Sequence, residues 1–172
     1  MGRYIIVVGY MGSGKTTVSR CLERKYGFRR LELDALIEEK AHMSISEIFR
    51  TQGEQGFRRM ETDLLLKIAK KKSDADPDTV LSAGGGTVLR EENRKLLKEI
   101  GEVIYLRITP EEVIARLGND RSRPMLNAPD RERQIREMME YREPMYRDAA
   151  DREIDAGHRK PEEIAEEILK TV

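Results

Sequence analysis

The chain has 172 residues, a length that suits one domain, and its 32 Lys and Arg side chains balance 32 Asp and Glu side chains. A net charge of zero gives no electrostatic reason to expect a nucleic-acid or anionic-membrane partner. The single cysteine, Cys21, excludes an internal disulfide. No apolar run approaches the roughly 18 residues that cross a bilayer, and the first strand begins too early for a signal peptide, so we predict a cytoplasmic protein.

Short apolar runs alternate with longer segments of helical periodicity. The runs typical of strands are residues 4–8, 30–33, 79–83, 103–106 and 152–155. The helical segments are residues 15–26, 34–39, 45–51, 53–71, 90–100, 110–117, 130–147 and 161–171. Because short strands separated by helices form parallel sheets with helices on both faces, the pattern predicts an α/β fold.

The segment that follows the first strand has the sequence GYMGSGKTT and contains a G-x-x-x-x-G-K-T motif between Gly9 and Thr16. Its glycines let backbone N–H groups curve around an anion, and the next helix adds the partial positive charge of its N-terminus. Lys15 can reach the β- and γ-phosphates, and the Thr16 hydroxyl can bind Mg²⁺. The motif, placed between a strand and a helix, predicts a protein that binds a nucleotide.

Two carboxylates, Glu32 and Asp34, lie at the end of the second predicted strand. Their side chains point to opposite faces if the strand continues through them. The carboxyl ends of parallel strands line the ligand crevice, so an acidic residue here could hold Mg²⁺ through water or accept a proton from a hydroxyl group. Asp34 could equally be the N-cap of the following helix, and sequence position does not separate these interpretations.

The third predicted strand ends in the sequence SAGGGT, residues 82–87. Three consecutive glycines expose backbone N–H groups and allow a ligand to approach closely. Ser82 stands where many nucleoside triphosphatases place an acidic residue, which counts against an ATPase motor. The chain also lacks the N-K-x-D and D-x-x-G elements of a GTPase switch.

Two segments stand apart from the predicted core. Residues 34–71 form a long helical crossover that suits a substrate-binding subdomain. Residues 118–129 are polar, basic and glycine-containing, a composition that fits either a lid over a phosphate site or a plain exposed loop. Guanidinium groups bind carboxylates and phosphates through paired hydrogen bonds. The arginines that could do so in this chain are Arg58, Arg116, Arg123 and Arg142.

Taken together, these elements resemble the shikimate kinase family, in the nucleoside-monophosphate-kinase-like group of P-loop proteins. The resemblance runs from Tyr4 to about Leu169 through the pieces GYMGSGKTT, LELDALIEE, ISEIFRTQGEQGFRRME, LSAGGGTV, VIYLRIT, ARLGNDRSRPML and YREPMYRDAA. It implies a three-layer P-loop kinase fold with a five-stranded parallel sheet, in a single domain of residues 1–172. Within that domain it implies the substrate-binding subdomain at 34–71 and the lid at 118–129.

The resemblance also implies a nucleotide-binding set. The residues expected on the ATP phosphates are Gly12, Ser13, Gly14, Lys15, Thr16 and Thr17. Arg123 would enter with the lid and neutralise charge at the β/γ bridge, acting in catalysis with Lys15. The sides of the adenine slot would be Arg116 and the segment that contains Arg159 and Pro161.

For the substrate, the resemblance implies a clamp in which Arg58 and Arg142 bind the carboxylate of shikimate. Asp34 would hold the attacking hydroxyl group, either as general base or as orienting group. Further contacts would come from the backbone of the glycine loop and from apolar walls; the residues are Gly84, Gly85, Gly86, Phe49, Phe57 and Pro124.

One position departs from the family pattern, whose second strand usually ends in D-x-D. This chain has Glu32-Leu33-Asp34, so the carboxylate at position 32 is displaced by about one methylene group. We expect a water-mediated contact of Glu32 with Mg²⁺ to be altered and activity to be retained, because Mg²⁺ keeps most of its waters in such sites.

The resemblance implies an enzyme that uses ATP and Mg²⁺ to phosphorylate the 3-hydroxyl group of shikimate, in the pathway to chorismate and the aromatic amino acids. It also implies a monomer with small-molecule ligands. The nearest alternative is another small-molecule kinase of the same fold, such as a gluconate or nucleoside-monophosphate kinase. A second alternative is a non-catalytic nucleotide-binding module, which retention of Lys15, Asp34 and the arginines argues against.

Overall fold

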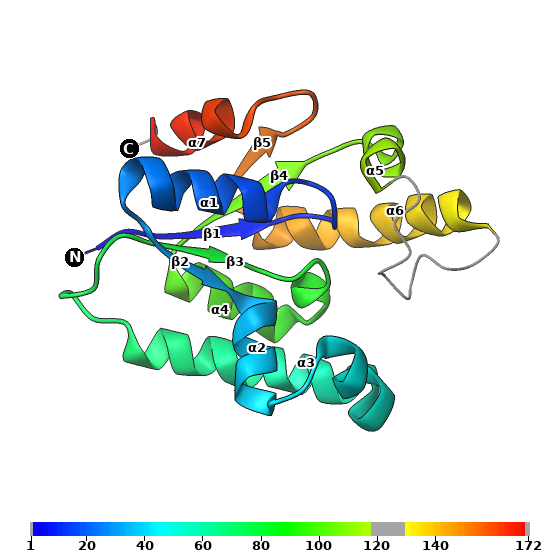
Figure 1. Ribbon diagram of the computed structural model, residues 1–172, viewed down its shortest axis with the longest axis horizontal. Helices are drawn as coiled ribbons and strands as arrows, with labels where there is room; N and C mark the ends of the chain where they lie inside the picture. Colours follow the sequence, from blue (N-terminus) through cyan, green and yellow to red (C-terminus); the bar gives the residue numbers. More distant parts are fainter. Residues whose placement is uncertain (1, 118–129, 171–172) are drawn as a thin grey trace.

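In a computed structural model of the protein, residues 2–117 and 130–170 are described. Five parallel strands form one sheet in the order β2-β3-β1-β4-β5 (Figure 1). The strands are β1 (Tyr4–Val8), β2 (Arg29–Glu32), β3 (Thr79–Ser82), β4 (Glu102–Arg107) and β5 (Arg152–Asp155). The predicted fold class is confirmed, and each predicted strand is found with its ends within about one residue.

The helices follow the predicted order with two differences. They are α1 (Lys15–Tyr26), α2 (Leu33–Ala41), α3 (Ile45–Lys71), α4 (Glu91–Ile100), α5 (Pro110–Leu117), α6 (Arg131–Ala149) and α7 (Pro161–Leu169). The helices predicted at 45–51 and 53–71 form one element, α3, kinked at Gly53, where φ is 70° and ψ is 178°. A short 3₁₀ helix, η1 (Thr87–Leu89), was not predicted.

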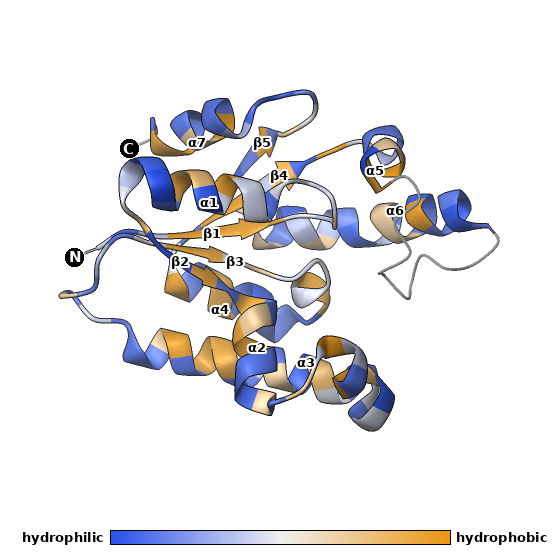
Figure 2. Ribbon diagram, viewed as in Figure 1, coloured by the Kyte–Doolittle hydropathy of each residue, from blue (hydrophilic) through white to orange (hydrophobic). Residues whose placement is uncertain are grey.

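Side chains on the three central strands, β1, β3 and β4, alternate between two buried clusters. On β1, Ile5 and Val7 pack with apolar residues of α1 and α7, whereas Ile6 and Val8 pack with those of α3, α4 and α6. Figure 2 shows the apolar central strands between helices that turn their polar sides outward. A parallel sheet buried on both faces requires this continuous apolar character. Among the described residues, no helix combines the length and apolarity needed to cross a bilayer.

The strand order brings the predicted functional loops together. β1 pairs with β3, with Val7 opposite Ser82, so the loop after β1 lies beside the glycine loop after β3. β2 pairs with β3 on the other side, with Glu32 opposite Ser82. The loops after β1, β2 and β3 therefore meet at one edge of the sheet, where open α/β sheets bind their ligands.

Candidate active site

The loop after β1 has the backbone shape of an anion-binding site. Gly12 has φ 80° and Gly14 has φ 95°, left-handed conformations that strain other residues. Gly14 is the N-cap of α1, so the N–H groups of the first helical turn are directed into the loop. The Lys15 ammonium donates to the carbonyl oxygens of Gly9 at 2.8 Å and Tyr10 at 3.0 Å. The Lys15 side chain therefore lies against the loop that is expected to bind the phosphates.

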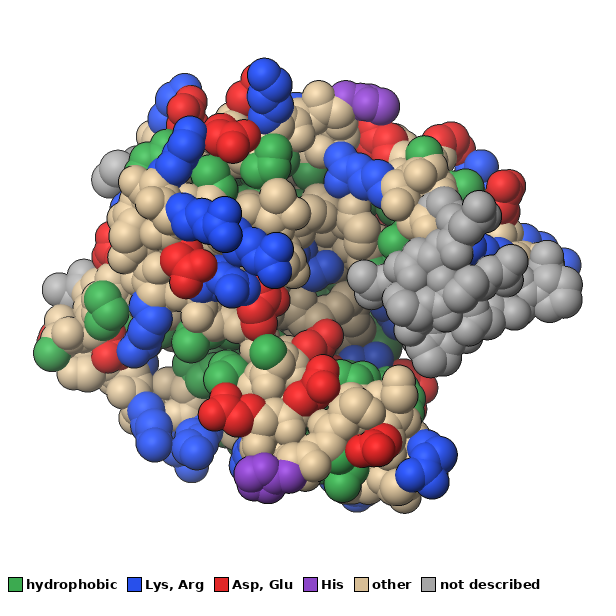
Figure 3. Space-filling model, viewed as in Figure 1, with side chains coloured by type: hydrophobic (Ala, Val, Ile, Leu, Met, Phe, Trp, Pro, Cys, Tyr) green, Lys and Arg blue, Asp and Glu red, His purple; other side chains and the backbone are tan. Residues whose placement is uncertain are grey.

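This loop opens into a cavity of about 390 Å³ at the carboxyl edge of the sheet. Its walls contain predicted residues of both the nucleotide and the substrate sets. The lining residues are Met11, Gly12, Gly14, Lys15, Thr16, Thr17, Glu32, Asp34, Ser82, Ala83, Gly84, Gly85 and Arg116. Figure 3 shows the molecule from the same side as Figure 1, with this face hollowed near its centre. The cavity joins the two predicted sites in one space.

The second strand ends earlier than predicted, which changes the arrangement of its two carboxylates. β2 ends at Glu32, which is the N-cap residue of α2, and Asp34 lies in the first turn of that helix. Interpretation of Asp34 as the N-cap is therefore wrong. Opposite faces were expected only if the strand continued through both residues; the chain instead turns into a helix at Leu33, and both residues line the same cavity.

Asp34 lies against the glycine loop. Its Oδ1 atom is 2.9 Å from the position that a Cβ atom on Gly84 would occupy, so only glycine fits there without displacing the carboxylate. The surrounding protein raises the pKa of Asp34, while the positive charges of Lys15 and then Arg58 lower it. Asp34 also lines the cavity, and the residue as a whole is exposed. Asp34 thus combines proximity to the cations with access to a bound ligand.

Glu32 is held by neighbours at the foot of α1. Its Oε1 atom accepts from Arg30 Nη1 at 2.7 Å and from Ser19 Oγ at 3.3 Å. With Thr16, it supplies the carboxylate and hydroxyl oxygens that a hydrated Mg²⁺ ion bound to phosphates accepts. The chemistry of these oxygen ligands fits Mg²⁺. Among residues 2–117 and 130–170, no group of three or more His, Cys, Asp or Glu side chains forms a metal cluster of its own.

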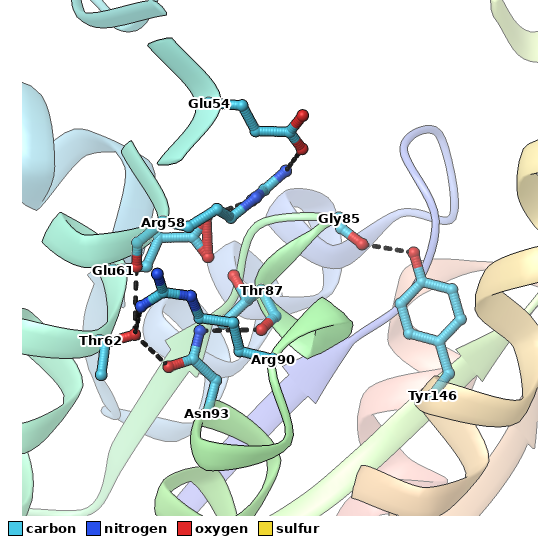
Figure 4. Close-up of polar contacts among 9 residues, drawn as sticks. All are labelled: Glu54, Arg58, Glu61, Thr62, Gly85, Thr87, Arg90, Asn93 and Tyr146. Atoms are coloured by element: carbon cyan, nitrogen blue, oxygen red, sulfur yellow. Dashed lines mark hydrogen bonds and ion pairs between the residues drawn. The ribbon is translucent and has the colours of Figure 1, made fainter. Parts of the chain in front are cut away.

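Arg58 is buried on α3, where an acidic partner holds its guanidinium group. Nη1 donates to Glu61 Oε1, and Nη2 lies 3.4 Å from Glu54 Oε1 (Figure 4). The guanidinium group packs so closely on Gly86 that a Cβ atom at this glycine would overlap it. The ring of Phe57 lies under the same group at 5.2 Å and contacts the Phe49 ring at 4.9 Å. The predicted residues of this wall are therefore adjacent.

Glu61 is a buried carboxylate that sequence reasoning missed. It is 0% exposed, and burial raises its pKa, with Arg58 the largest opposing influence. Glu61 Oε2 and Thr87 Oγ1 have no hydrogen-bond partner among the described residues. The positive charge of Arg58 is therefore the main group that stabilises the buried carboxylate in its ionised form. An acidic residue three positions after Arg58 on a helix was the available signal.

Arg142 approaches the glycine loop from the opposite side. It lies on α6, is 4% exposed, and its guanidinium carbon is 5.9 Å from the centre of the Tyr10 ring. Its Nη1 atom is 3.6 Å from the position of a Cβ atom on Gly85. Arg58 and Arg142 are thus brought to the same loop by different helices, as a clamp requires.

Arg116 contacts the segment between β5 and α7, and Arg159 lies within that segment. Arg116 donates to the carbonyl oxygens of Gly12 at 2.9 Å and Ala156 at 3.1 Å, which joins this segment to the phosphate loop. Arg159 donates to the Asp155 carbonyl oxygen at 3.2 Å and pairs with Glu167 at 2.5 Å. Pro161 begins α7. The predicted lid at 118–129, with Arg123 and Pro124, lies outside the described residues.

Comparison with known proteins identifies the family. The family model for shikimate kinase matches residues 11–172. The chain belongs to the shikimate kinase family. A shikimate kinase of Caldanaerobacter subterraneus is 37% identical over 166 residues, which cover 96% of this chain and 94% of that protein.

Solved structures agree with the shikimate kinase assignment. A shikimate kinase from Acinetobacter baumannii in complex with shikimate superposes with a TM-score of 0.89 and is 35% identical; the match covers 99% of this chain and 92% of that one. A gluconokinase from Sinorhizobium meliloti reaches a TM-score of 0.52 at 15% identity, over 97% of this chain and 89% of that one. At that identity the likeness shows the fold alone. The gluconate alternative is therefore a distant neighbour.

Proposed function

We propose that this protein is a shikimate kinase that transfers the γ-phosphoryl group of ATP to the 3-hydroxyl group of shikimate. The observation that carries the proposal is the pair of buried arginines, Arg58 and Arg142, on either side of a glycine loop that lies next to the phosphate loop. Guanidinium groups recognise a carboxylate through paired hydrogen bonds. A small hydroxy acid anchored between them would reach the phosphate-binding cavity.

In this proposal the triphosphate of ATP binds the backbone N–H groups of the loop from Gly12 to Thr17. The Lys15 ammonium exchanges its carbonyl partners, Gly9 and Tyr10, for phosphate oxygens and stabilises the charge on the transferring group. Arg116 and the segment from Arg159 to Pro161 flank the adenine base. Arg123, with the lid, adds a further cation at the β/γ bridge.

Shikimate binds with its carboxylate between Arg58 and Arg142 and its ring between the backbone of Gly84–Gly86 and the wall of Phe49 and Phe57. Glu61 holds the Arg58 guanidinium group in place by accepting a hydrogen bond from Arg58 Nη1. The 3-hydroxyl group faces Asp34, which orients it and takes its proton as the bond to phosphorus forms. The proximity of the two reactants then supplies much of the rate enhancement.

Mg²⁺ would bind Thr16 and the ATP phosphates, with Glu32 contacting it through water. The ion would neutralise phosphate charge and so favour attack by the hydroxyl group. Arg30 competes for the same carboxylate, because its Nη1 atom lies 2.7 Å from Glu32 Oε1. The contact with Arg30 and the longer side chain at position 32 are therefore expected to alter how Glu32 contacts the ion.

A coupled ADP-release assay tests the proposal. Shikimate is compared with gluconate, a nucleoside monophosphate and water as phosphoryl acceptors. We expect ADP release to depend on shikimate and to be at least 100-fold slower with the other acceptors, because they do not match two arginines set for one ring-borne carboxylate. ATP binding without shikimate-dependent ADP release would instead support a non-catalytic nucleotide-binding module.

Several features of the protein stay predictions within this proposal. Residues 34–71 form the substrate-binding subdomain, and residues 118–129 form the lid of a single domain. The protein is a cytoplasmic monomer whose ligands are small molecules. Size-exclusion chromatography with light scattering measures the oligomeric state.

A further inference from the structure

The two helices that carry the arginine clamp share a spacing of functional side chains. On α3, Thr62 follows Arg58 by four residues, and on α6, Tyr146 follows Arg142 by four residues. Residues four apart lie on the same side of a helix. In each pair the second residue links its helix to the backbone around the glycine loop (Figure 4). Tyr146 bonds to Gly85, and Thr62 bonds through Asn93 to Thr87, the residue after the loop.

On the α6 side the connection is direct. The Tyr146 hydroxyl donates to the Gly85 carbonyl oxygen at 2.5 Å. The residue is 1% exposed, and its ring stacks on Tyr105 with 5.1 Å between ring centres. Burial raises the pKa of Tyr146, so the hydroxyl keeps its proton and remains a donor at physiological pH. The ring is fixed by packing, and its hydroxyl fixes the middle of the glycine loop.

On the α3 side the connection passes through a buried amide on α4. The Thr62 hydroxyl lies 2.7 Å from Asn93 Oδ1, and Asn93 Nδ2 donates to the Thr87 carbonyl oxygen at 3.0 Å. Asn93 is 0% exposed and Thr62 is 5% exposed. The Thr62 hydroxyl also receives a bond from Arg90 at 3.1 Å. Buried polar groups that satisfy one another in this way hold their elements in one arrangement.

Glycines impose little conformation of their own, so contacts outside the glycine loop must specify its position. A helix is stiff over one turn, and a bond from position i+4 therefore also fixes the arginine at position i relative to the glycine loop. We infer that Tyr146 and the Thr62–Asn93 pair are positioning residues that set the separation of Arg58 and Arg142 across this loop for the substrate carboxylate. This inference rests on the proposed function.

Substitutions that remove one hydroxyl group each test the inference. Tyr146→Phe keeps the stacked ring, and Thr62→Val keeps the side-chain volume. Loss of a buried hydrogen bond to a neutral group predicts a rise of about tenfold in the shikimate KM and in its calorimetric Kd for each variant. The kcat and the ADP Kd are expected to change by less than about twofold. Thr62→Ser keeps the hydroxyl group and should restore the wild-type KM.

Matched controls are available at the opposite edge of the sheet. Tyr4→Phe removes a hydroxyl group that donates to Asp76 at 2.6 Å, and Thr79→Val removes one that donates to the Pro77 carbonyl oxygen at 2.8 Å. Thr79→Val deletes a hydrogen bond to a neutral carbonyl group, and Tyr4→Phe deletes one to a carboxylate; both bonds lie far from the glycine loop. We expect both controls to leave the shikimate KM unchanged even where they lower the melting temperature.

An analogue of shikimate with a hydroxymethyl group in place of the carboxylate separates positioning from general damage. The penalty of Tyr146→Phe and Thr62→Val should fall below about twofold for this analogue, because it does not use the clamp. An equal penalty for both ligands, or for ADP, overturns the inference, as does an unchanged shikimate KM in both variants. A wild-type protein that neither binds nor phosphorylates shikimate refutes the proposed function and the inference with it.

Discussion

Replacement of Arg58 by alanine is expected to damage two properties by different routes. The Arg58 side chain is 9% exposed and its ion-pair partner Glu61 is 0% exposed. The change removes one half of the proposed carboxylate clamp and also leaves a buried carboxylate without its cation. The first effect concerns shikimate binding, and the second concerns folding stability.

The two magnitudes follow from burial. Loss of one cation from a desolvated, hydrogen-bonded carboxylate costs roughly 2–4 kcal/mol, so kcat/KM for shikimate should fall roughly 30-fold to 900-fold. Breaking the buried pair with Glu61 should lower the free energy of unfolding by about 3–5 kcal/mol at neutral pH. The KM for ATP should change little, because Arg58 packs on Gly86, in the glycine loop, while the nucleotide phosphates are assigned to the loop after β1.

The stability loss should depend on pH in a defined direction. Burial raises the pKa of Glu61 above its ordinary value of 4.5, and removal of Arg58 raises it further. A carboxyl group with a raised pKa in the folded state favours folding below its unfolded pKa, and this contribution disappears as pH rises through the folded pKa. The deficit of Arg58→Ala relative to wild type should therefore be smaller at pH 5 than at pH 8.

Chemical denaturation at both pH values and steady-state kinetics measure these effects. Arg59→Ala, at the next and exposed position of α3, is the matched control and should leave both properties unchanged. The double variant Arg58→Ala/Glu61→Gln removes the stranded charge, so it should recover most of the stability and none of the shikimate affinity. An unchanged shikimate KM in Arg58→Ala would refute the substrate assignment, and a pH-independent deficit would refute the role of Glu61.

Three further predictions concern the neighbouring residues. In Gly86→Ala the new methyl group overlaps the Arg58 guanidinium group, so the shikimate KM should rise at least fivefold with the ATP KM unchanged. An equal shikimate KM in the variant and the wild type would contradict this packing. Asp34 must be ionised to accept a proton, and its pKa is raised above the ordinary value of 3.8, so kcat/KM should fall as the pH drops towards this raised pKa. Asp34→Asn should abolish this pH dependence and reduce kcat at least 100-fold. Replacement of Glu32 by alanine should raise the Mg²⁺ concentration for half-maximal turnover about threefold, and Glu32→Asp should lower it; if neither change alters the Mg²⁺ dependence, position 32 has no metal role.

The features predicted correctly from the sequence are those fixed by local pattern. The apolar run from Tyr4 to Val8 fits a strand buried on both faces, and the glycine spacing that follows has an unstrained solution with positive φ at Gly12 and Gly14. The kink at Gly53 was visible only as a gap between two predicted helices, because local sequence does not show whether hydrogen bonding continues across a glycine.

The features missed depend on residues that meet only in the folded chain. The strand β2 ends at Glu32, one residue earlier than predicted, and Glu32, not Asp34, is the N-cap of α2; the local sequence does not mark this end. Tyr146 reaches Gly85 across 61 positions of sequence, and Thr62 reaches Asn93 across 31. A lone polar residue inside a helix gives no indication of its partner, so these contacts required the structure.

A crystal structure of the protein with shikimate and a non-hydrolysable ATP analogue tests the central claim most directly. We expect the shikimate carboxylate to lie within about 3 Å of both the Arg58 and Arg142 guanidinium groups, with the 3-hydroxyl group beside Asp34 and directed at the γ-phosphate. A carboxylate bound elsewhere, or either arginine turned away from it, would contradict the account.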